Sequence, residues 1–305
     1  MTPKSFLRRT AALIALVMSG SVMAADPVVV SSKIDTEGSV LGQMVLQSLE
    51  GAGIPVENRL QLGGTSIVRN AIKAGEIDIY PEYTGNAAFF HDQAERDIWK
   101  DADKAYQEAA RLDKEAHNIV WLEPAEANNT WAMSVRGDLA REHNLATLED
   151  LAEYINEDGA FKFAASAEFV ESASALPAFQ EAYGFELESD QLLILSGGNT
   201  AATLRAAALN SNDVNGAMTY GTDGGLDALD LKVMEDTAGV QPVYQPAPIV
   251  RGEVLETYPK IREVLTPIFE SLDLETLQRL NGQVAVNGVP ADTVARDYLD
   301  SLAQD

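Results

Sequence analysis

The sequence predicts an α/β protein with two lobes, and three observations support this. Short apolar strands alternate with helical stretches after residue 24, which is typical of largely parallel sheets covered by helices. The alternation occurs in two sets, before and after about residue 130. The chain of 305 residues is also long enough to form two hydrophobic cores.

The first 24 residues read as a secretory signal peptide rather than as part of the fold. Lys4, Arg8 and Arg9 precede the apolar run "TAALIALVMSG", which is too short to span a bilayer, and small residues follow. The chain contains no Cys, which excludes a lipoprotein anchor, disulfides and zinc held by thiolates. We therefore expect an exported protein of the bacterial periplasm without a lipid anchor.

The first set of elements follows the signal peptide in β-α-β-α-β order. We expect strands at 27–33, 55–62, 77–81 and 118–124, and helices at 38–53, 65–76 and 94–117. The stretch from Gly51 to Gly53 would close the first helix, and Thr65 or Ser66 would cap the second. This order predicts an α/β lobe with a largely parallel sheet.

The second set begins at "TWAMSVRGDLA" and again alternates strands with helices. We expect strands at 131–136, 161–166, 190–196 and 214–221, and helices at 147–155, 174–184 and 200–210. The tail, from about Leu231, holds further strands and three helices. If it returns to the first lobe, the chain crosses twice, near 129–131 and 220–225. The expected division is 25–130 with 225–305 in lobe I, and 131–224 in lobe II.

Enzyme chemistry finds little support in the sequence. His91, His117 and His143 are the only histidines, they have no metal-ligand spacing, and we expect them at the surface. No nucleophile elbow, P-loop or dinucleotide-binding glycine pattern is present. The formal charge of −25 also makes nucleic acid an unfavourable partner. We expect no catalytic residues, no cofactor and no metal, and keep an exported enzyme as the less favoured alternative.

Four aromatic residues fall at strand-end loops, where α/β proteins bind their ligands. Tyr83, Trp131, Tyr220 and Tyr244 would together form a cage for a quaternary ammonium, which aromatic faces hold without hydrogen bonds. Each ring taken alone is equally typical of a half-buried position at a sheet edge. Lys33 ends the first strand beside a helix start, where a carboxylate would bind.

These stretches resemble the glycine-betaine/choline-binding proteins of osmoprotectant ABC importers. The resemblance covers essentially the whole chain after residue 24 and lies in the segments "SSKIDTEG", "GEIDIYPEYTGNAAFF", "AEANNTWAMSVR", "SAEFVESASALPAF" and "AMTYGTDG". It implies a type II periplasmic binding fold with two lobes that close over a ligand in the cleft between them. It also implies an aromatic box at Tyr83, Trp131, Tyr220 and Tyr244, with Lys33 at the ligand carboxylate.

Two positions depart from the pattern of this family. Asn86 stands where many relatives have Thr, and an amide still donates a hydrogen bond. Ser172 stands where relatives have an Arg that clamps the ligand carboxylate, and losing a charge-assisted pair costs about 1.5–3 kcal/mol. Arg69, Arg136 or Arg251 would be the candidates to compensate.

The resemblance implies a solute-binding component that captures glycine betaine or a related quaternary-ammonium osmoprotectant. Its partners would be this ligand and an ABC permease in the inner membrane, and we expect a monomer. Choline, carnitine or another small solute are the alternative ligands. Within "YPEYTG", we expect Tyr83 to face the ligand, Tyr80 to be structural, and Glu82 to brace the next helix.

Overall fold

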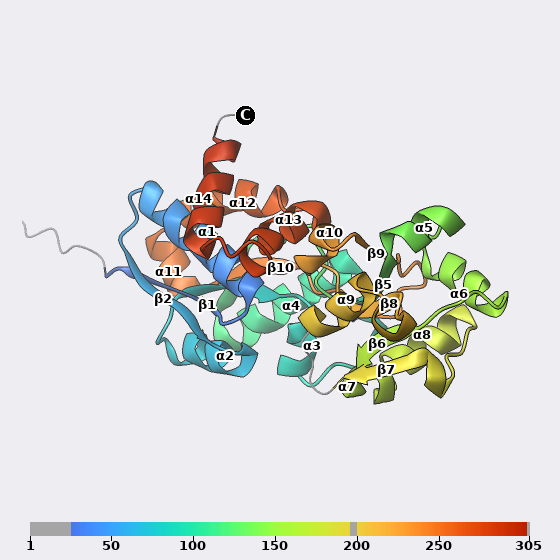
Figure 1. Ribbon diagram of the computed structural model, residues 1–305. Coiled ribbons are helices and arrows are strands. Elements are labelled where there is room, and N and C mark those ends of the chain that lie inside the picture. Colours follow the sequence, from blue (N-terminus) through green and yellow to red (C-terminus); the bar gives the residue numbers. More distant parts are fainter. Residues whose placement is uncertain (1–25, 196–199, 304–305) are drawn as a thin grey trace, which may run out of the picture.

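The strands of the described residues form two five-stranded sheets, which lie in separate lobes (Figure 1). The computed structural model describes residues 26–195 and 200–303. The predicted signal peptide, residues 1–24, lies outside the described residues. Within the described ranges no helix is long and apolar enough to cross a bilayer.

The first sheet has the strand order β2-β1-β3-β10-β4. Its strands are β1 (Val28–Lys33), β2 (Val56–Gly63), β3 (Ile79–Tyr83), β4 (Ile119–Trp121) and β10 (Pro246–Arg251). The helices of this part are α1 (Thr36–Gly51), α2 (Thr65–Ala74), α3 (Asn86–Phe90), η1 (Asp97–Lys100), α4 (Ala102–His117), α11 (Gly252–Thr257), α12 (Lys260–Glu270), α13 (Leu274–Ala285) and α14 (Ala291–Leu302).

The second sheet has the strand order β7-β6-β8-β5-β9. Its strands are β5 (Trp131–Arg136), β6 (Phe163–Ser166), β7 (Leu192–Leu195), β8 (Gly216–Tyr220) and β9 (Leu231–Val233). The helices of this part are α5 (Gly137–His143), α6 (Leu148–Asn156), α7 (Ala167–Glu171), α8 (Leu176–Tyr183), η2 (Ser189–Gln191), α9 (Thr200–Ala208), η3 (Ser211–Asp213) and α10 (Gly225–Ala228).

Each sheet is covered by helices on both faces, which gives each lobe two apolar clusters. In the first sheet, Val28 and Val30 pack with α1, whereas Val29 packs against the cluster around Trp99 on the opposite face. This alternation is expected of a strand buried on both sides. The second sheet packs around Phe169 and Phe179 on one face and around Leu204 on the other.

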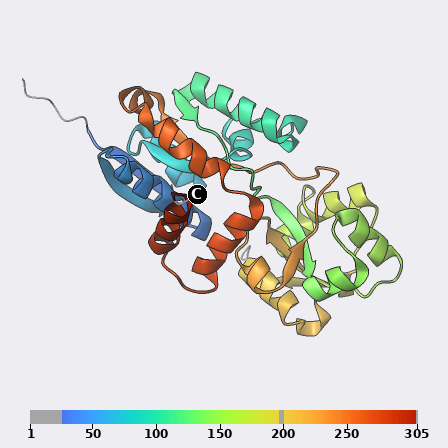
Figure 2. The same ribbon diagram turned by 90° about the horizontal axis from the view of Figure 1, so that it is seen from above.

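Both sheets are mixed, so the expectation of largely parallel sheets is wrong for one central strand in each. β1 runs parallel to β2 and β3, but β10 runs antiparallel to β3 and β4. Likewise β5 runs antiparallel to β8. The cause is the pair of crossings between the lobes (Figure 2). The chain crosses where the parallel strands end, so the strand after each crossing starts at that edge and runs back.

The return to the first lobe comes later in the chain than the sequence indicates. Residues from 225 onward are expected in lobe I, yet β9 pairs with β5 through Ser134↔Val233 and belongs to the second sheet. The next strand, β10, begins only at Pro246. We therefore propose that the second crossing lies between Val233 and Pro246, and the exact limits of the lobes stay a prediction.

Two local predictions are also wrong. Gly64, not Thr65 or Ser66, is the N-cap of α2, and no side chain caps this helix. The expected helix 94–117 starts only at Ala102, because the Asp101 carboxylate accepts a hydrogen bond from Lys104 N (3.0 Å) and fixes the helix start there. The short 3₁₀ turn η1 precedes it.

Candidate functional site

Five of the predicted site residues lie at or next to strand ends where the two lobes meet. Lys33 ends β1 and Tyr83 ends β3, both in the first sheet. Tyr220 ends β8 and Trp131 begins β5 in the second sheet, directly opposite each other in the register. Tyr244 precedes β10 by two residues, on the second crossing. Both lobes and both crossings thus contribute to one location.

Trp131 and Tyr220 form the part of the site that belongs to the second lobe. Both side chains are half-buried, and the Trp131 indole meets Phe169 edge-on with ring centroids 5.7 Å apart. The Trp131 N–H is buried next to the Tyr220 hydroxyl but has no hydrogen bond of good geometry to any described residue. Burial raises the pKa of Tyr220 above its usual range, so the phenol stays neutral.

The backbone of Tyr244 forms hydrogen bonds with residues of the first crossing, and its ring packs against Gly85. Its backbone N–H donates to the Asn128 side chain (2.8 Å), and its carbonyl accepts from Asn129 N (3.0 Å). A Cβ on Gly85 would lie 2.8 Å from the Tyr244 ring, so the ring needs a glycine in the "YTGN" turn. Burial, with smaller effects of Tyr220 and Glu82, raises the pKa of Tyr244 to about 12.

Tyr83 is almost completely buried, at 6% exposure. Its hydroxyl donates to a Glu37 carboxylate oxygen at 2.7 Å. The Lys33 ammonium lies over the Tyr83 ring, 4.5 Å from the centroid. Burial, followed by the charge of Glu37, places the pKa of Tyr83 well above its usual range. One face of this ring therefore already carries a cation from the protein itself.

Lys33 and Asn86 meet at the carboxylate of Glu82, which is fully buried. Lys33 forms an ion pair with it, and Asn86, the first residue of α3, donates a hydrogen bond of 2.7 Å. The Tyr80 hydroxyl (2.8 Å) and Tyr83 N (2.7 Å) donate as well. Glu82 thus contacts the first residue of the following helix, and it also neutralises the ammonium expected at the ligand carboxylate.

Ser172 lies at the C-terminus of α7, and its hydroxyl is 3.0 Å from that of Ser174. The three arginines considered as replacements are each paired elsewhere. Arg69 pairs with Asp113, Arg136 with Asp138, and Arg251 with Asp78 and Glu253. Each guanidinium is therefore already held by a carboxylate of the fold.

Glu37 is a further candidate site residue, which no motif in the sequence predicts. Its buried carboxylate accepts from Tyr83, from Asn281 (2.7 Å) and from Asn129 (3.2 Å). The Asn281 amide also donates to Thr222 O (2.9 Å), which follows β8 of the second lobe. Burial raises the pKa of Glu37 from its usual value. The only signal in the sequence was its place in "DTEG", three residues before Val40.

At the start of α1, one of the backbone N–H groups expected to attract a carboxylate is already taken by the N-cap residue. The Asp35 side chain accepts from Gly38 N (2.7 Å), and the Asp35 carbonyl accepts from Ser39 N (2.9 Å). The Ser39 bond is the first regular bond of the helix, so Asp35 takes up the Gly38 N–H as a normal N-cap does.

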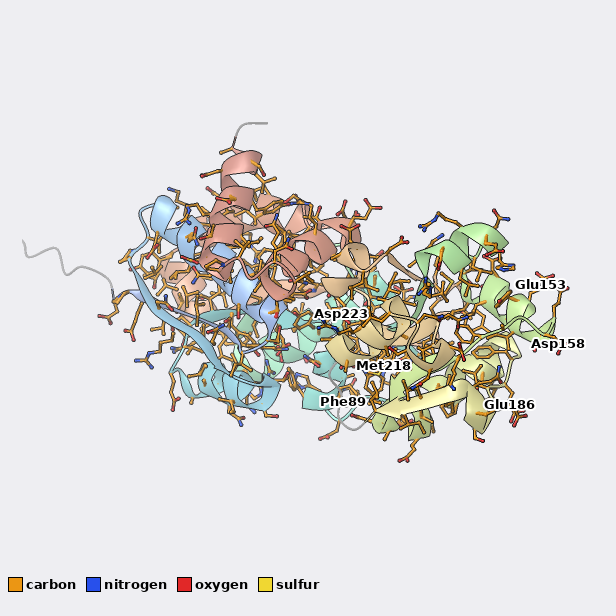
Figure 3. All side chains as sticks on the ribbon, in the orientation of Figure 1. Phe89, Glu153, Asp158, Glu186, Met218 and Asp223 are labelled. Carbon is orange, nitrogen blue, oxygen red and sulfur yellow. The ribbon has the colours of Figure 1, made fainter. Side chains whose placement is uncertain are left out.

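Asp223 is the corresponding missed carboxylate in the second lobe, and Figure 3 places it where the lobes meet. It is half-buried and accepts from Tyr220 N (2.8 Å) and from the Thr219 hydroxyl (2.9 Å). Burial raises the pKa of Asp223 above its usual value. Asp223 lies in "AMTYGTDG", one of the segments that carry the family resemblance, but it was not among the expected site residues.

The surface hollow and the histidine described next do not offer a second candidate ligand-binding site in the described part of the chain. A surface hollow of about 410 Å³ lies around Arg141 and Lys232, but Arg141 pairs with Asp230, and Lys232 donates to Leu145 O. Within the described ranges, no group of three or more His, Asp or Glu residues is placed to hold a metal ion. His91, expected at the surface, is 11% exposed, and its Nε2 lies 2.8 Å from Asp113.

Comparison with known proteins identifies relatives over almost the entire chain. Residues 26–301 match the model of a family described as the substrate binding domain of the ABC-type glycine betaine transport system. The glycine betaine-binding protein YehZ of Escherichia coli is 54% identical over 278 residues, 91% of each chain. A glycine-betaine-binding protein of Pseudomonas aeruginosa is 30% identical over 281 residues, covering 90% of this chain and 88% of the relative.

Solved structures agree with the fold. Apo YehZ from Escherichia coli superimposes with a TM-score of 0.87, covering 91% of this chain and 99% of that one. A structure described as a glycine betaine/carnitine/choline ABC transporter superimposes with a TM-score of 0.80, covering 90% and 98% of the two chains. Its identity of 22% supports the fold alone. The two lobes match the type II periplasmic binding proteins.

Proposed function

This chain belongs to the family of substrate-binding domains of ABC-type glycine betaine transport systems, and from that we propose that it captures a small quaternary-ammonium osmoprotectant in the periplasm. The ligand class is that of glycine betaine, with choline and carnitine as the alternatives. Delivery is to the permease of the same ABC transporter in the inner membrane. We propose that the binding protein itself is a monomer and carries no lipid anchor.

One observation supports this proposal most directly. Trp131, Tyr220 and Tyr244 are half-buried aromatic side chains that come from the second lobe and from both crossings to one location. Phenol and indole groups stay neutral there and offer π faces to a trimethylammonium group at about 0.5–2 kcal/mol for each contact. Because both crossings carry part of the site, closure of the lobes would bring these rings onto the ligand.

Tyr83 takes a different role in this proposal. Its ring is 6% exposed and lies under the Lys33 ammonium, so it supports the site from behind. We propose ligand contacts for Trp131, Tyr220 and Tyr244, and a supporting role for Tyr83, Lys33 and Asn86. Ser172 is proposed to lie at the rim, where relatives of this chain are expected to hold a ligand carboxylate.

Calorimetric titration tests the proposal. The protein is stripped of ligand by unfolding and refolding, then titrated with glycine betaine and with choline. Trp131→Ala is expected to weaken binding about tenfold, and Trp131→Phe, which keeps a π face, less than that. Tyr154→Ala serves as the control because α6 lies at the far end of the second lobe (Figure 1). Equal affinities in all four proteins would contradict the aromatic site.

The alternative to a binding function is that of an exported enzyme, and we propose that this chain has no catalytic activity. The family supplies substrate-binding proteins of transporters. The groups at the site are phenols, an indole, amides, the ion-paired Lys33 ammonium, and carboxylates that accept hydrogen bonds from other residues of the fold. The same titrations followed by mass spectrometry decide the point, since a product that accumulates with time would revive an enzymatic function.

A further inference from the structure

The cations of this site are already neutralised by the protein. Lys33 is 4% exposed and ion-paired with Glu82, which is fully buried. Ser172 occupies the position where the family resemblance implies an arginine. Arg69, Arg136 and Arg251 each pair with a carboxylate outside the site. A ligand carboxylate would therefore meet no free positive charge among these residues.

Two carboxylates of the site, in contrast, have only neutral partners. Glu37 accepts from one phenol and two amides, and Asp223 accepts from a backbone N–H and a hydroxyl. Among the residues that the structure describes, no Lys, Arg or His lies within 4.0 Å of either carboxylate. A buried charge without a counter-ion is unfavourable, and a cation placed nearby would relieve this.

The two carboxylates lie directly behind aromatic groups of the site, one in each lobe. Glu37 contacts the hydroxyl of Tyr83, and Asp223 contacts the backbone of Tyr220. A trimethylammonium group that arrives between the lobes would thus be attracted from both sides. Burial also raises the pKa of both acids, which is the sign expected of carboxylates that lack a nearby cation.

We propose that this site selects quaternary-ammonium solutes with a net positive charge over zwitterions, and that Glu37 and Asp223 set this preference. The inference rests on the proposed function and narrows its ligand class. A choline-like cation gains from both carboxylates, whereas the carboxylate of a zwitterion is repelled by them and finds Lys33 already paired.

A matched pair of ligands tests the preference. Glycine betaine and its carboxamide have nearly the same size and shape, but only the carboxamide is a net cation. We expect calorimetric titration to show that the carboxamide binds at least about tenfold more tightly than glycine betaine. Choline should also bind more tightly than glycine betaine. Glycine betaine binding as tightly as its carboxamide, or more tightly, would overturn the inference and leave the proposed function standing. No binding of any trimethylammonium ligand would instead contradict the proposed function.

Three variants assign the preference to its residues. Glu37→Gln and Asp223→Asn are each expected to reduce the carboxamide preference by about threefold or more. The Asn281 Oδ1 atom has no hydrogen-bond partner among the described residues and can accept from the new Gln amide, so this variant is expected to fold. Ser172→Arg adds the missing cation at a half-buried position and should move the preference toward glycine betaine.

A control variant separates this effect from a general effect of charge. Asp138→Asn also removes one carboxylate from the second lobe, but Asp138 pairs with Arg136 away from the site. Its ratio of the two dissociation constants should equal that of the unmodified protein. If Glu37→Gln and Asp223→Asn both leave this ratio unchanged as well, the proposed role of the two carboxylates is wrong.

Discussion

At the scale of single residues, Gly85 determines where the Tyr244 ring lies. A Cβ at this position would come within 2.8 Å of the Tyr244 ring and of Val243 O. Real Cβ atoms do not approach so closely, so Gly85→Ala must displace the second crossing. We expect a loss of about 1–3 kcal/mol in unfolding free energy, as in overpacked cores. Ligand affinity should fall about tenfold because the Tyr244 ring moves.

Thermal melts and calorimetric titration measure both effects of Gly85→Ala. Gly51→Ala is the matched control, because a Cβ on this last residue of α1 would meet nothing within 4 Å beyond its own helix backbone and chain neighbours. It should leave binding unchanged and stability equal or slightly higher. Wild-type affinity in Gly85→Ala would show that the ring position does not matter for binding.

Local patterns in the sequence predict the aromatic residues of the proposed site but not the carboxylates behind them. Strand-end position is a local property, so Trp131, Tyr220 and Tyr244 were accessible to pattern analysis. The partners of Glu37 are distant in sequence, and Asn281 lies 244 residues away. No local pattern reports such a contact. In the same way, the ion pair between Lys33 and Glu82 became visible only once β1 and β3 were placed side by side.

At the scale of elements, Asp35 fixes the start of α1 and thereby the position of Glu37. Its side chain accepts from Gly38 N at 2.7 Å. Asp35→Ala should cost about 1 kcal/mol of stability, the usual contribution of an N-cap. Because Glu37 lies in the first turn of the same helix, ligand affinity should fall as well.

A second N-cap provides the control for Asp35→Ala. Asp101 caps α4 in the same way, with a hydrogen bond from Lys104 N. Asp101→Ala should lower the melting temperature by a similar amount in thermal unfolding but leave the titrated ligand affinity unchanged. If both variants bind like the unmodified protein, the start of α1 has no part in positioning Glu37.

Asp113 of α4 joins three further elements in the first lobe. Its carboxylate pairs with Arg69 of α2 and accepts from Trp121 of β4 (2.8 Å), next to His91. Burial alone would raise the pKa of Asp113, but Arg69, His91 and Trp121 more than offset this, and the pKa lies below its usual value. Asp113→Asn should cost about 3–5 kcal/mol, since it leaves a buried guanidinium unpaired.

The lowered pKa of Asp113 also predicts how stability depends on pH. Because the folded-state pKa is below the unfolded value of about 3.9, the stabilisation is present above that pH and is lost as the pH falls below it. The pH values of about 5 and about 2 lie on either side of the unfolded-state pKa. Between them, the melting temperature of Asp113→Asn should therefore fall less than that of the unmodified protein. Asp138→Asn breaks an exposed pair and should cost about 0–1 kcal/mol, so it is the control for the size of the stability loss at neutral pH. Parallel curves for Asp113→Asn and the unmodified protein would exclude this role.

Most elements followed from local pattern, and the exceptions have tertiary causes. The periodic segments at 38–53 and 200–210 became α1 and α9 with small changes at their ends. β9 is the exception that shifts the expected boundary between the lobes. Its three residues, Leu231–Val233, are too few for their sequence pattern to indicate which sheet they join. Its pairing with β5 depends on the path of the chain after β8, which composition does not report.

At the scale of the whole molecule, the lobes contact each other through two glycines. A Cβ on Gly282 of α13 would lie 2.7 Å from Gly224 O, and a Cβ on Gly224 would lie 2.1 Å from Gly282 N. Next to this contact, the Gln278 side chain donates to Gly221 O (2.7 Å) and Asn281 donates to Thr222 O (2.9 Å). The backbone of α13 thus lies directly against the loop after β8, beside Glu37 and Asp223.

Gly282→Ala separates the effect of this contact from that of helix propensity. In a helix, Gly→Ala normally stabilises by about 1 kcal/mol. Here the added methyl group meets backbone atoms of the other lobe, so α13 and the Gly224 loop must move apart. We expect a lower melting temperature despite the better helix former, and about tenfold weaker ligand binding, because the lobes no longer meet in the geometry that closes the site. Small-angle X-ray scattering should show a smaller decrease in the radius of gyration on adding ligand than in the Gly51→Ala control. A more stable Gly282→Ala protein with unchanged affinity and compaction would mean that closure does not depend on this contact.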